Sequence, residues 1–222
     1  VRLEWSSDFA YAIGLLVTDG CLYNDGRHIS LTTKDIEQAQ NFKKCLNLKV
    51  KIGRKSRNTL GEKKYYHVQF GDVIFYRFLE SLGLSKAKSK TIGEVKIPDK
   101  YFFDYLRGCF DGDGTFYSYW DTRWPSSHMF YLEFASASKK YISSLQEKLF
   151  SELGVRGYLA RSNKRVCYQL KYAKRESVVV IKKMYYNPAV VCLSRKYTKI
   201  RKVLVVEGKQ QKLFLKNRAQ VA

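Results

Sequence analysis

The feature that most constrains the fold is an internal repeat, because two segments of the chain match each other without gaps. They are Ala12-Ile-Gly-Leu-Leu-Val-Thr-Asp-Gly20 and Leu106-Arg-Gly-Cys-Phe-Asp-Gly-Asp-Gly114, and the match puts Asp19 opposite Asp113. A repeat has to be identified first, since it changes the interpretation of every other segment. The chain is therefore expected to contain two copies of one structural unit.

The segments that follow each match also correspond. Alternating apolar and polar residues around turn sequences predict a hairpin after each match, then a helix, two more strands and a closing helix. The first copy has strands at 21–23 and 28–33, a helix at 34–46, strands at 49–55 and 64–70, and a helix at 73–82. The second copy has strands at 115–120 and 130–136, a helix at 139–153, strands at 156–162 and 166–172, and a helix at 177–185.

These elements predict an α+β fold with two pseudo-symmetric αββαββα units. Gly93 and Pro98 interrupt helical patterning between residues 91 and 100, which places the junction there. We expect an N-terminal unit with its linker at 1–96, a C-terminal unit at 97–206, and a basic tail at 207–222 that has weak periodicity and is expected to be frayed.

The charge indicates a polyanionic partner. The chain has 41 Lys and Arg against 20 Asp and Glu, which leaves a net charge of +21. Nucleic acid is the leading candidate partner, and an anionic membrane surface is the weaker one. Because apolar runs long enough to cross a bilayer and a leader pattern are missing, a soluble, intracellular protein is expected. Five cysteines without a CxxC pair, and scattered histidines, argue against a zinc ribbon or a disulfide framework.

The matched segments read as helices with a face of small residues. Ala10, Gly14 and Thr18 recur every four residues, which permits close approach of a second helix. Close packing would bring Asp19 and Asp113 together at two helix C-termini, where the helix dipole and mutual repulsion disfavour negative charge. A hard divalent cation such as Mg²⁺ would relieve this conflict and would support phosphodiester hydrolysis. The alternative is that each Asp-Gly pair only ends a helix, with glycine in a left-handed conformation.

These residues resemble the LAGLIDADG homing endonucleases in their single-chain, two-motif form. The resemblance covers most of residues 8–205 and includes the linker Leu84-Ser-Lys-Ala-Lys-Ser-Lys90. It implies a monomer in which two motif helices pack at the centre of a saddle of antiparallel sheets. It also implies cleavage of one phosphodiester on each strand of a long, non-palindromic DNA target, in the service of intron or intein mobility. One departure from the repeat is Val17, which stands where the second copy has Asp111.

The resemblance also implies a set of site residues. Asp19 and Asp113 would hold Mg²⁺, with the carbonyls of Gly20 and Gly114 as further ligands; Mn²⁺ is a plausible substitute, and Ca²⁺ is expected to support binding without cleavage. A lysine beside each scissile phosphate corresponds here to Lys88 and Lys196, although simple phosphate contacts are an equal alternative and their basic neighbours compete for the role, namely Lys86, Lys90, Arg195 and Lys199. Polar residues that end the second strand of each unit would hold a water, and these are Thr33 and Ser138.

The strands are expected to read DNA, because a strand advances about 3.3 Å per residue and B-DNA about 3.4 Å per base pair. Alternation points His67 and Gln69 outward in the first unit and Gln169 and Lys171 outward in the second. The remaining expected contacts are Ser30, Lys34, Arg54, Lys55, Tyr117, Tyr119, Arg123, Glu133, Ser138 and Arg161. The alternative for each residue is an ordinary solvated strand face.

Three other functions remain open at this point. An intron RNA maturase would use the same basic, aromatic-rich surface to bind its own intron RNA. A DNA-binding regulator that does not cleave would be expected to have lost one of the two acids, and a basic scaffold protein leaves the matched carboxylates unexplained.

Overall fold

The computed structural model describes residues 1–56, 64–162 and 167–219, with side chains up to residue 208. The N-terminal unit contains α1 (Ser7–Asp19), β1 (Gly20–Leu22), β2 (His28–Thr33), α2 (Ile36–Cys45), β3 (Gly53–Lys55), β4 (Tyr65–Gly71) and α3 (Val73–Ser81). Two short 3₁₀ helices follow in the linker, η1 (Lys88–Lys90) and η2 (Asp99–Tyr101). The C-terminal unit contains α4 (Phe102–Asp113), β5 (Thr115–Trp120), β6 (His128–Ser136), α5 (Lys139–Leu153), β7 (Tyr158–Arg161), β8 (Tyr168–Ala173) and α6 (Lys174–Met184), and α7 (Ser194–Ala219) comes last.

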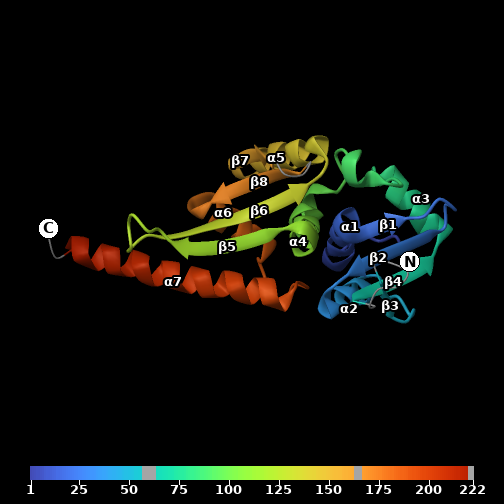
Figure 1. The fold of residues 1–222 in the computed structure, drawn as a ribbon, viewed down its shortest axis with the longest axis horizontal. Coiled ribbons are helices and arrows are strands. Elements are labelled where there is room, and N and C mark those ends of the chain that lie inside the picture. Colours follow the sequence, from blue (N-terminus) through green and yellow to red (C-terminus); the bar gives the residue numbers. More distant parts are fainter. Residues whose placement is uncertain (57–63, 163–166, 220–222) are drawn as a thin grey trace.

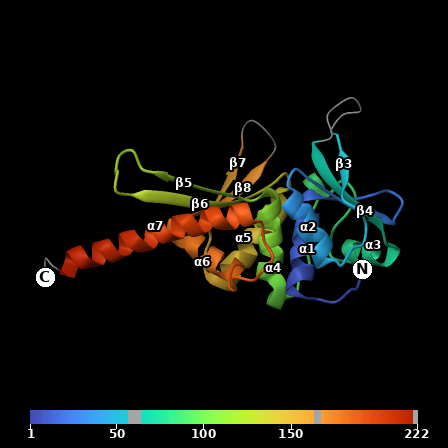
Figure 2. The ribbon, with the colours of Figure 1, turned by 90° about the horizontal axis from the view of Figure 1, so that it is seen from below.

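The two units have the same topology. Each forms a four-stranded antiparallel sheet, with strand orders β1-β2-β4-β3 and β5-β6-β8-β7. Figures 1 and 2 show α1 and α4 side by side in the middle of the molecule, with one sheet on either side. The predicted α+β class and the predicted pair of αββαββα units are confirmed.

The central position of α1 follows from its composition. Its residues from Phe9 to Val17 are all buried, so this helix is covered on every side, as a helix without a polar face must be. The Ser6 hydroxyl accepts a hydrogen bond from the Phe9 amide and caps the first turn. Asp35, Asp72 and Ser138 cap α2, α3 and α5 in the same way.

Contact between α1 and α4 is made by backbone atoms. A Cβ added to Gly14 would lie 2.2 Å from the Tyr105 carbonyl oxygen, and one added to Gly108 would lie 2.1 Å from the Tyr11 carbonyl oxygen. Only glycine fits at either position, as the small-residue face predicted. Because the two helices touch along their length and end at equivalent residues, Asp19 and Asp113 come to the same end of the pair.

Several predicted boundaries differ from the structure. The strand predicted at 49–55 is confined to β3, the helix predicted at 34–46 starts at Ile36, and the helix predicted at 177–185 already starts at Lys174. The predicted start of the last strand, Val166, lies outside the described residues. The five cysteines are free, and Cys109 is the one that is buried. Within the described ranges, no helix is both long and apolar enough to cross a membrane.

Residues 207–219, which were expected to form a frayed tail, belong to α7 instead. This helix crosses the expected boundary at residue 206 and continues to Ala219. Figure 2 shows α7 running beside the β5–β6 hairpin and projecting past it. Ile200, Val203 and Glu207 are its buried residues in this stretch, and the Glu207 carboxylate lies 2.6 Å from Lys174 Nζ. This inward face holds the first half of the helix against the C-terminal unit, and the exposed residues up to 208 include Arg195, Lys199, Arg201 and Lys202 beside Val205.

Candidate active site and DNA-binding surface

Asp19 and Asp113 are the last residues of α1 and α4, and a strand follows each of them directly. Gly20 and Gly114 cap the two helices in an extended conformation, with φ of −85° and −76°. Neither glycine has the left-handed conformation, so the alternative explanation of the two Asp-Gly pairs as left-handed helix caps does not hold. A Cβ on Gly112 of α4 would lie 3.0 Å from Asp19 Oδ2, so the Asp19 carboxylate reaches across to the neighbouring helix.

The surroundings of both carboxylates disfavour their negative charge. Burial, with a further contribution from the nearby Asp113, raises the pKa of Asp19 to about 6, although Gln38 Nε2 donates a hydrogen bond to Asp19 Oδ2 at 2.5 Å. The Asp113 side chain keeps contact with solvent, and the packing around it still raises its pKa. Two such carboxylates at adjoining helix C-termini form a place where a cation is stabilising.

Two lysines come to this site, one from each unit, and their ammonium groups bind the helix ends. Lys88 Nζ donates to the Gly20 carbonyl. Lys196 Nζ donates to the carbonyls of Gly114, at 2.7 Å, and of Asp111, at 2.9 Å. Burial lowers the pKa of Lys88, and it lowers the pKa of Lys196 to about 8. Their basic neighbours are exposed and lie outside this arrangement, namely Lys86, Lys90, Arg195 and Lys199.

The oxygen atoms at this site fit a hard cation. Within the described residues there is no cluster of three or more His, Cys, Asp or Glu that could hold a metal ion alone. A cation would therefore bind to the carboxylates of Asp19 and Asp113 and complete its shell with water and substrate oxygens, as Mg²⁺ characteristically does. The Gly20 and Gly114 carbonyls each accept a lysine N–H here, which leaves them weaker candidate ligands than the carboxylates.

Gln38 was not singled out from the sequence. It lies on α2, it is 3% exposed, and besides its bond to Asp19 it accepts a hydrogen bond from the Thr33 hydroxyl at 2.9 Å. Thr33 therefore orients Gln38, a role different from the expected binding of a water. Gln38 stands three residues after the α2 cap, Asp35, where a glutamine usually signals a helix start, so the local sequence does not reveal its contact with α1.

The register places most of the expected base-reading residues on one face of each sheet, away from the core. In β4, Val68 and Phe70 are buried, whereas Gln69 is exposed and His67 partly exposed. In β8, Leu170 is buried and the side chains on either side of it are partly exposed. The outer faces thus carry Ser30, Lys55, His67 and Gln69 in the N-terminal sheet and Tyr117, Tyr119, Glu133, Gln169 and Lys171 in the C-terminal sheet.

A family model described as the LAGLIDADG-like domain matches residues 103–217, which is about half of the chain. The chain belongs to the LAGLIDADG family. The match covers the C-terminal unit and most of α7, and the N-terminal unit repeats the same topology. No curated protein sequence matches this chain.

Solved LAGLIDADG structures share the fold at low sequence identity. The I-LtrWI homing endonuclease bound to its target DNA superposes with a TM-score of 0.58 at 12% identity, over 93% of this chain and 91% of that one. The meganuclease I-SmaMI, bound to uncleaved DNA in the presence of calcium ions, gives a TM-score of 0.59 at 12% identity, over 93% of both chains. Full-length WhiA from Thermotoga maritima gives 0.57 at 12% identity, over 98% of this chain and 69% of that one.

Within this LAGLIDADG fold, two of the expected contacts are on the other side of the sheet. Arg54 lies opposite Tyr66, and Arg161 lies opposite Tyr168, and these tyrosines share the face of the buried core residues. Each guanidinium lies over the ring of its tyrosine, at 4.2 Å and 6.0 Å from the ring centroid. These two arginines are therefore removed from the base-reading set.

Three other expected contacts are covered. Ser30 is 2% exposed, and Glu133 is 7% exposed with Lys171 Nζ at 3.4 Å from its carboxylate, although both lie on the outer face. Ser138 caps α5 and donates a hydrogen bond to the Ile92 carbonyl at 2.5 Å, so it neither holds a water nor faces DNA. The last two expected contacts, Lys34 and Arg123, are exposed but lie in loops beyond the strands.

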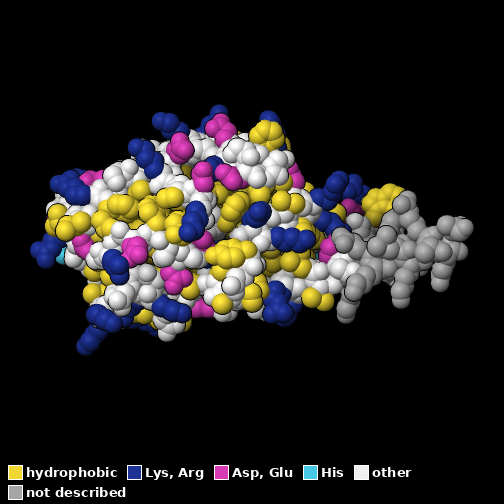
Figure 3. All heavy atoms as spheres, turned by 180° about the vertical axis from the view of Figure 1, so that it is seen from behind, with side chains coloured by type: hydrophobic (Ala, Val, Ile, Leu, Met, Phe, Trp, Pro, Cys, Tyr) yellow, Lys and Arg dark blue, Asp and Glu magenta, His cyan; other side chains and the backbone are white. Residues whose placement is uncertain are grey.

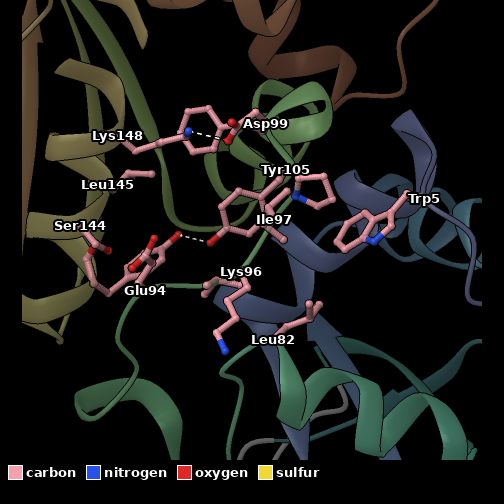
Figure 4. Close-up of a pocket in the computed structure, with 14 residues that line it drawn as sticks. Trp5, Leu82, Glu94, Lys96, Ile97, Asp99, Tyr105, Ser144, Leu145 and Lys148 are labelled. Carbon is pink, nitrogen blue, oxygen red and sulfur yellow. Dashed lines mark hydrogen bonds and ion pairs between the residues drawn. The ribbon is translucent and has the colours of Figure 1, made fainter. Parts of the chain in front are cut away.

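Neither the charged surface seen in Figure 3 nor the pocket seen in Figure 4 moves the candidate active site from the ends of α1 and α4. On the face shown in Figure 3, lysine and arginine side chains are spread over the visible surface among fewer acidic ones. The pocket has a volume of about 470 Å³ and lies between Trp5, Ile97, Tyr105 and Lys148. It is at the N-terminal ends of the motif helices, opposite the carboxylates.

Proposed function

We propose that this LAGLIDADG protein is a metal-dependent, site-specific endonuclease that breaks one phosphodiester on each strand of double-stranded DNA. The observation that carries the proposal is the paired site at the ends of α1 and α4. There, a carboxylate and a lysine from each unit lie together, and the surrounding packing opposes the charge on Asp19, Asp113, Lys88 and Lys196. Groups whose pKa values are shifted in this way are typical of catalytic sites.

The residues have distinct roles in this proposal. Asp19 and Asp113 would hold Mg²⁺, which, when bound, activates water and stabilises the leaving 3′ oxygen. Gln38 fixes the orientation of the Asp19 carboxylate. Lys88 and Lys196 stabilise the charge that develops on the phosphate, and Lys196, with a pKa of about 8, is a suitable proton donor near neutral pH.

The outer faces of the sheets would read the target. Because the residues on the two faces differ, each unit would recognise a different half-site and the whole target would be non-palindromic. The solved I-LtrWI and I-SmaMI structures, which contain DNA, support a double-stranded DNA partner. Intron RNA has no support in the comparisons. Promotion of intron or intein mobility, in a compartment that holds DNA, is the biological role that we infer from this activity.

The active site is tested by Asp19→Asn and Asp113→Asn, on a target selected from a randomised DNA library. Each substitution keeps the side-chain size and removes the charge that attracts metal. Either variant should lose double-strand cleavage with Mg²⁺ or Mn²⁺, and both should keep most of their DNA binding in Ca²⁺. The measurements are cleavage of labelled duplex on a gel and binding by fluorescence anisotropy.

Asp8→Asn is the matched control, because it removes a carboxylate from the opposite end of α1. It should cut normally. Metal-dependent cleavage by the Asp19→Asn, Asp113→Asn double variant would refute the proposed site. A wild-type protein that binds its selected target and never cuts it would identify a DNA-binding protein without nuclease activity, a second candidate because the fold is shared with WhiA.

A further inference from the structure

Asp111 is a buried acid on α4 that the proposed catalytic roles leave unexplained. It is 0% exposed, and its Oδ2 accepts two hydrogen bonds, from the Leu193 amide at 2.7 Å and from the Tyr11 hydroxyl at 2.8 Å. Burying a carboxylate is costly, so both bonds have to compensate for the loss of water. In the N-terminal unit the matching position is Val17, which makes no such bond.

The Leu193 amide is important because α7 begins there. The Leu193 carbonyl accepts the first helical hydrogen bonds, from the amides of Lys196 at 3.1 Å and Tyr197 at 3.0 Å. Lys196 then extends back to the end of α4 and binds the Gly114 carbonyl. Asp111 on α4, the first turn of α7 and the Lys196 ammonium at the active site thus form one closed chain of contacts.

In the N-terminal unit, the segment that leads to the corresponding lysine, Lys88, is held in place without an acid. There the Leu84 amide donates to the Leu79 carbonyl of α3 at 3.0 Å, so the closing helix itself holds the segment that leads to Lys88. In the C-terminal unit α6 has already ended at Met184, well before Leu193, and the Asp111 carboxylate takes the place of that helix carbonyl. Because only the C-terminal unit needs this extra acceptor, Val17 of the first copy can stand opposite Asp111 of the second.

We propose that Asp111 is a positioning residue that anchors the start of α7 and thereby places Lys196 at one of the two cleavage sites. The inference rests on the proposed nuclease function. The required property of Asp111 is a hydrogen-bond acceptor at Oδ2, and the charge is secondary. Because Lys88 is held independently, loss of this acceptor should affect the cutting of one DNA strand only.

The test compares Asp111→Val, which copies the residue of the other unit and removes the acceptor, with Asp111→Asn, which keeps an oxygen there. A supercoiled plasmid carrying the selected target, labelled separately on each strand, measures the two strand breaks. Asp111→Val should slow one strand on the order of 10²-fold, because small displacements of a catalytic group have effects of that size. Nicked circles should therefore accumulate. Asp111→Asn should produce linear DNA nearly as fast as the wild type.

A double variant separates positioning from a general loss of structure. Lys196→Ala should slow the same strand, and Asp111→Val added to it should cause little further loss, since both act through one group. Equal slowing of both strands, additive effects, or equal defects in Asp111→Asn and Asp111→Val would overturn the proposal. If Asp111→Val does not fold, Asp111→Ser replaces it in the test. The serine side chain is one bond shorter than that of aspartate and does not reach Leu193, so the same outcomes are expected.

Amide hydrogen exchange provides a measurement that does not depend on cleavage. In Asp111→Val or Asp111→Ser, exchange at residues 193–197 should rise well above that of the wild type, while exchange in η1 should stay unchanged. Unchanged protection at 193–197 would overturn the proposal. If the wild-type protein cuts no DNA, the proposed function fails, and the exchange data still decide whether Asp111 anchors α7.

Discussion

At the Asp19 carboxylate, burial and the neighbouring Asp113 favour the protonated form, which links stability to pH. The pKa in the folded protein is about 6, above the ordinary value of 3.8, so the folded state holds this proton more tightly than the unfolded state does. The stability that the group contributes is complete below about pH 4 and is lost as the pH rises through about 6. Asn at this position cannot titrate.

We therefore expect the unfolding free energy of Asp19→Asn, measured by chemical denaturation without divalent metal, to rise relative to wild type between pH 4 and pH 7. Groups that do not interact with Asp19 cancel in this difference, whereas its charged neighbours Asp113, Lys88 and Lys196 contribute to it. A difference that falls with increasing pH would show that the Asp19 carboxylate is stabilised in its ionised form, contrary to the burial argument.

At the same scale, sequence reasoning found the carboxylates and lysines but missed their partners. Asp19 and Asp113 could be predicted because the repeat marks them twice. Gln38 could not be predicted, and Asp111 was marked only as a departure from the repeat, because each acts through a contact between elements far apart in the chain: Gln38 reaches Asp19, and Asp111 reaches Leu193. Local spacing contains no information about such contacts.

Among the elements, the motif helices were the most predictable, because both the repeat and the small-residue spacing identify them. Helix α7 was the least predictable. Its described buried residues, Ile200, Val203 and Glu207, follow a helical spacing, but in the sequence Gly208 and the basic stretch after it obscure the helical pattern. Arg54 was misplaced for a related reason, since alternation within β3 does not reveal which residue of β4 it pairs with.

Packing of the motif helices gives a direct stability test. Gly14→Ala should destabilise the protein by about 1–3 kcal/mol or more, because the new Cβ meets a backbone oxygen of α4 that cannot move away. Gly208→Ala in α7 is the matched control, since nothing lies within 4 Å of its Cβ position, and it should be neutral or stabilising by up to about 1 kcal/mol. Denaturant unfolding measures both. Equal effects would contradict the close contact of α1 and α4.

The two sheets should specify different ends of the target. Gln69→Ala and Gln169→Ala each remove one amide from an outer face, and each should relax preference at one or two base pairs at a cost of about 1–3 kcal/mol. These glutamines are preferable to Lys171, whose removal would also leave the buried Glu133 carboxylate without its partner. Selection from a randomised target measures the change. Loss of preference at the same end in both variants would contradict the division into half-sites.

For the molecule as a whole, the net charge of +21 should dominate affinity for DNA. With on the order of 6–10 phosphate contacts, binding should weaken by roughly 10³- to 10⁵-fold between about 50 and 200 mM salt. Anisotropy titrations in Ca²⁺ at several salt concentrations measure the slope. A slope near zero would exclude a binding mode based on the phosphate backbone.

The contact between α1 and α4 also has a consequence for how such chains can be recombined. It joins backbone to backbone at Gly14 and Gly108, so the junction demands small residues there, and it also needs the side-chain hydrogen bonds that cross it, such as that from Tyr11 to Asp111. The strands that would read DNA lie away from this junction, one sheet in each unit. We therefore expect half of such a chain to be exchangeable as a cassette where the incoming unit keeps the glycine and the hydrogen-bonding partners of the junction.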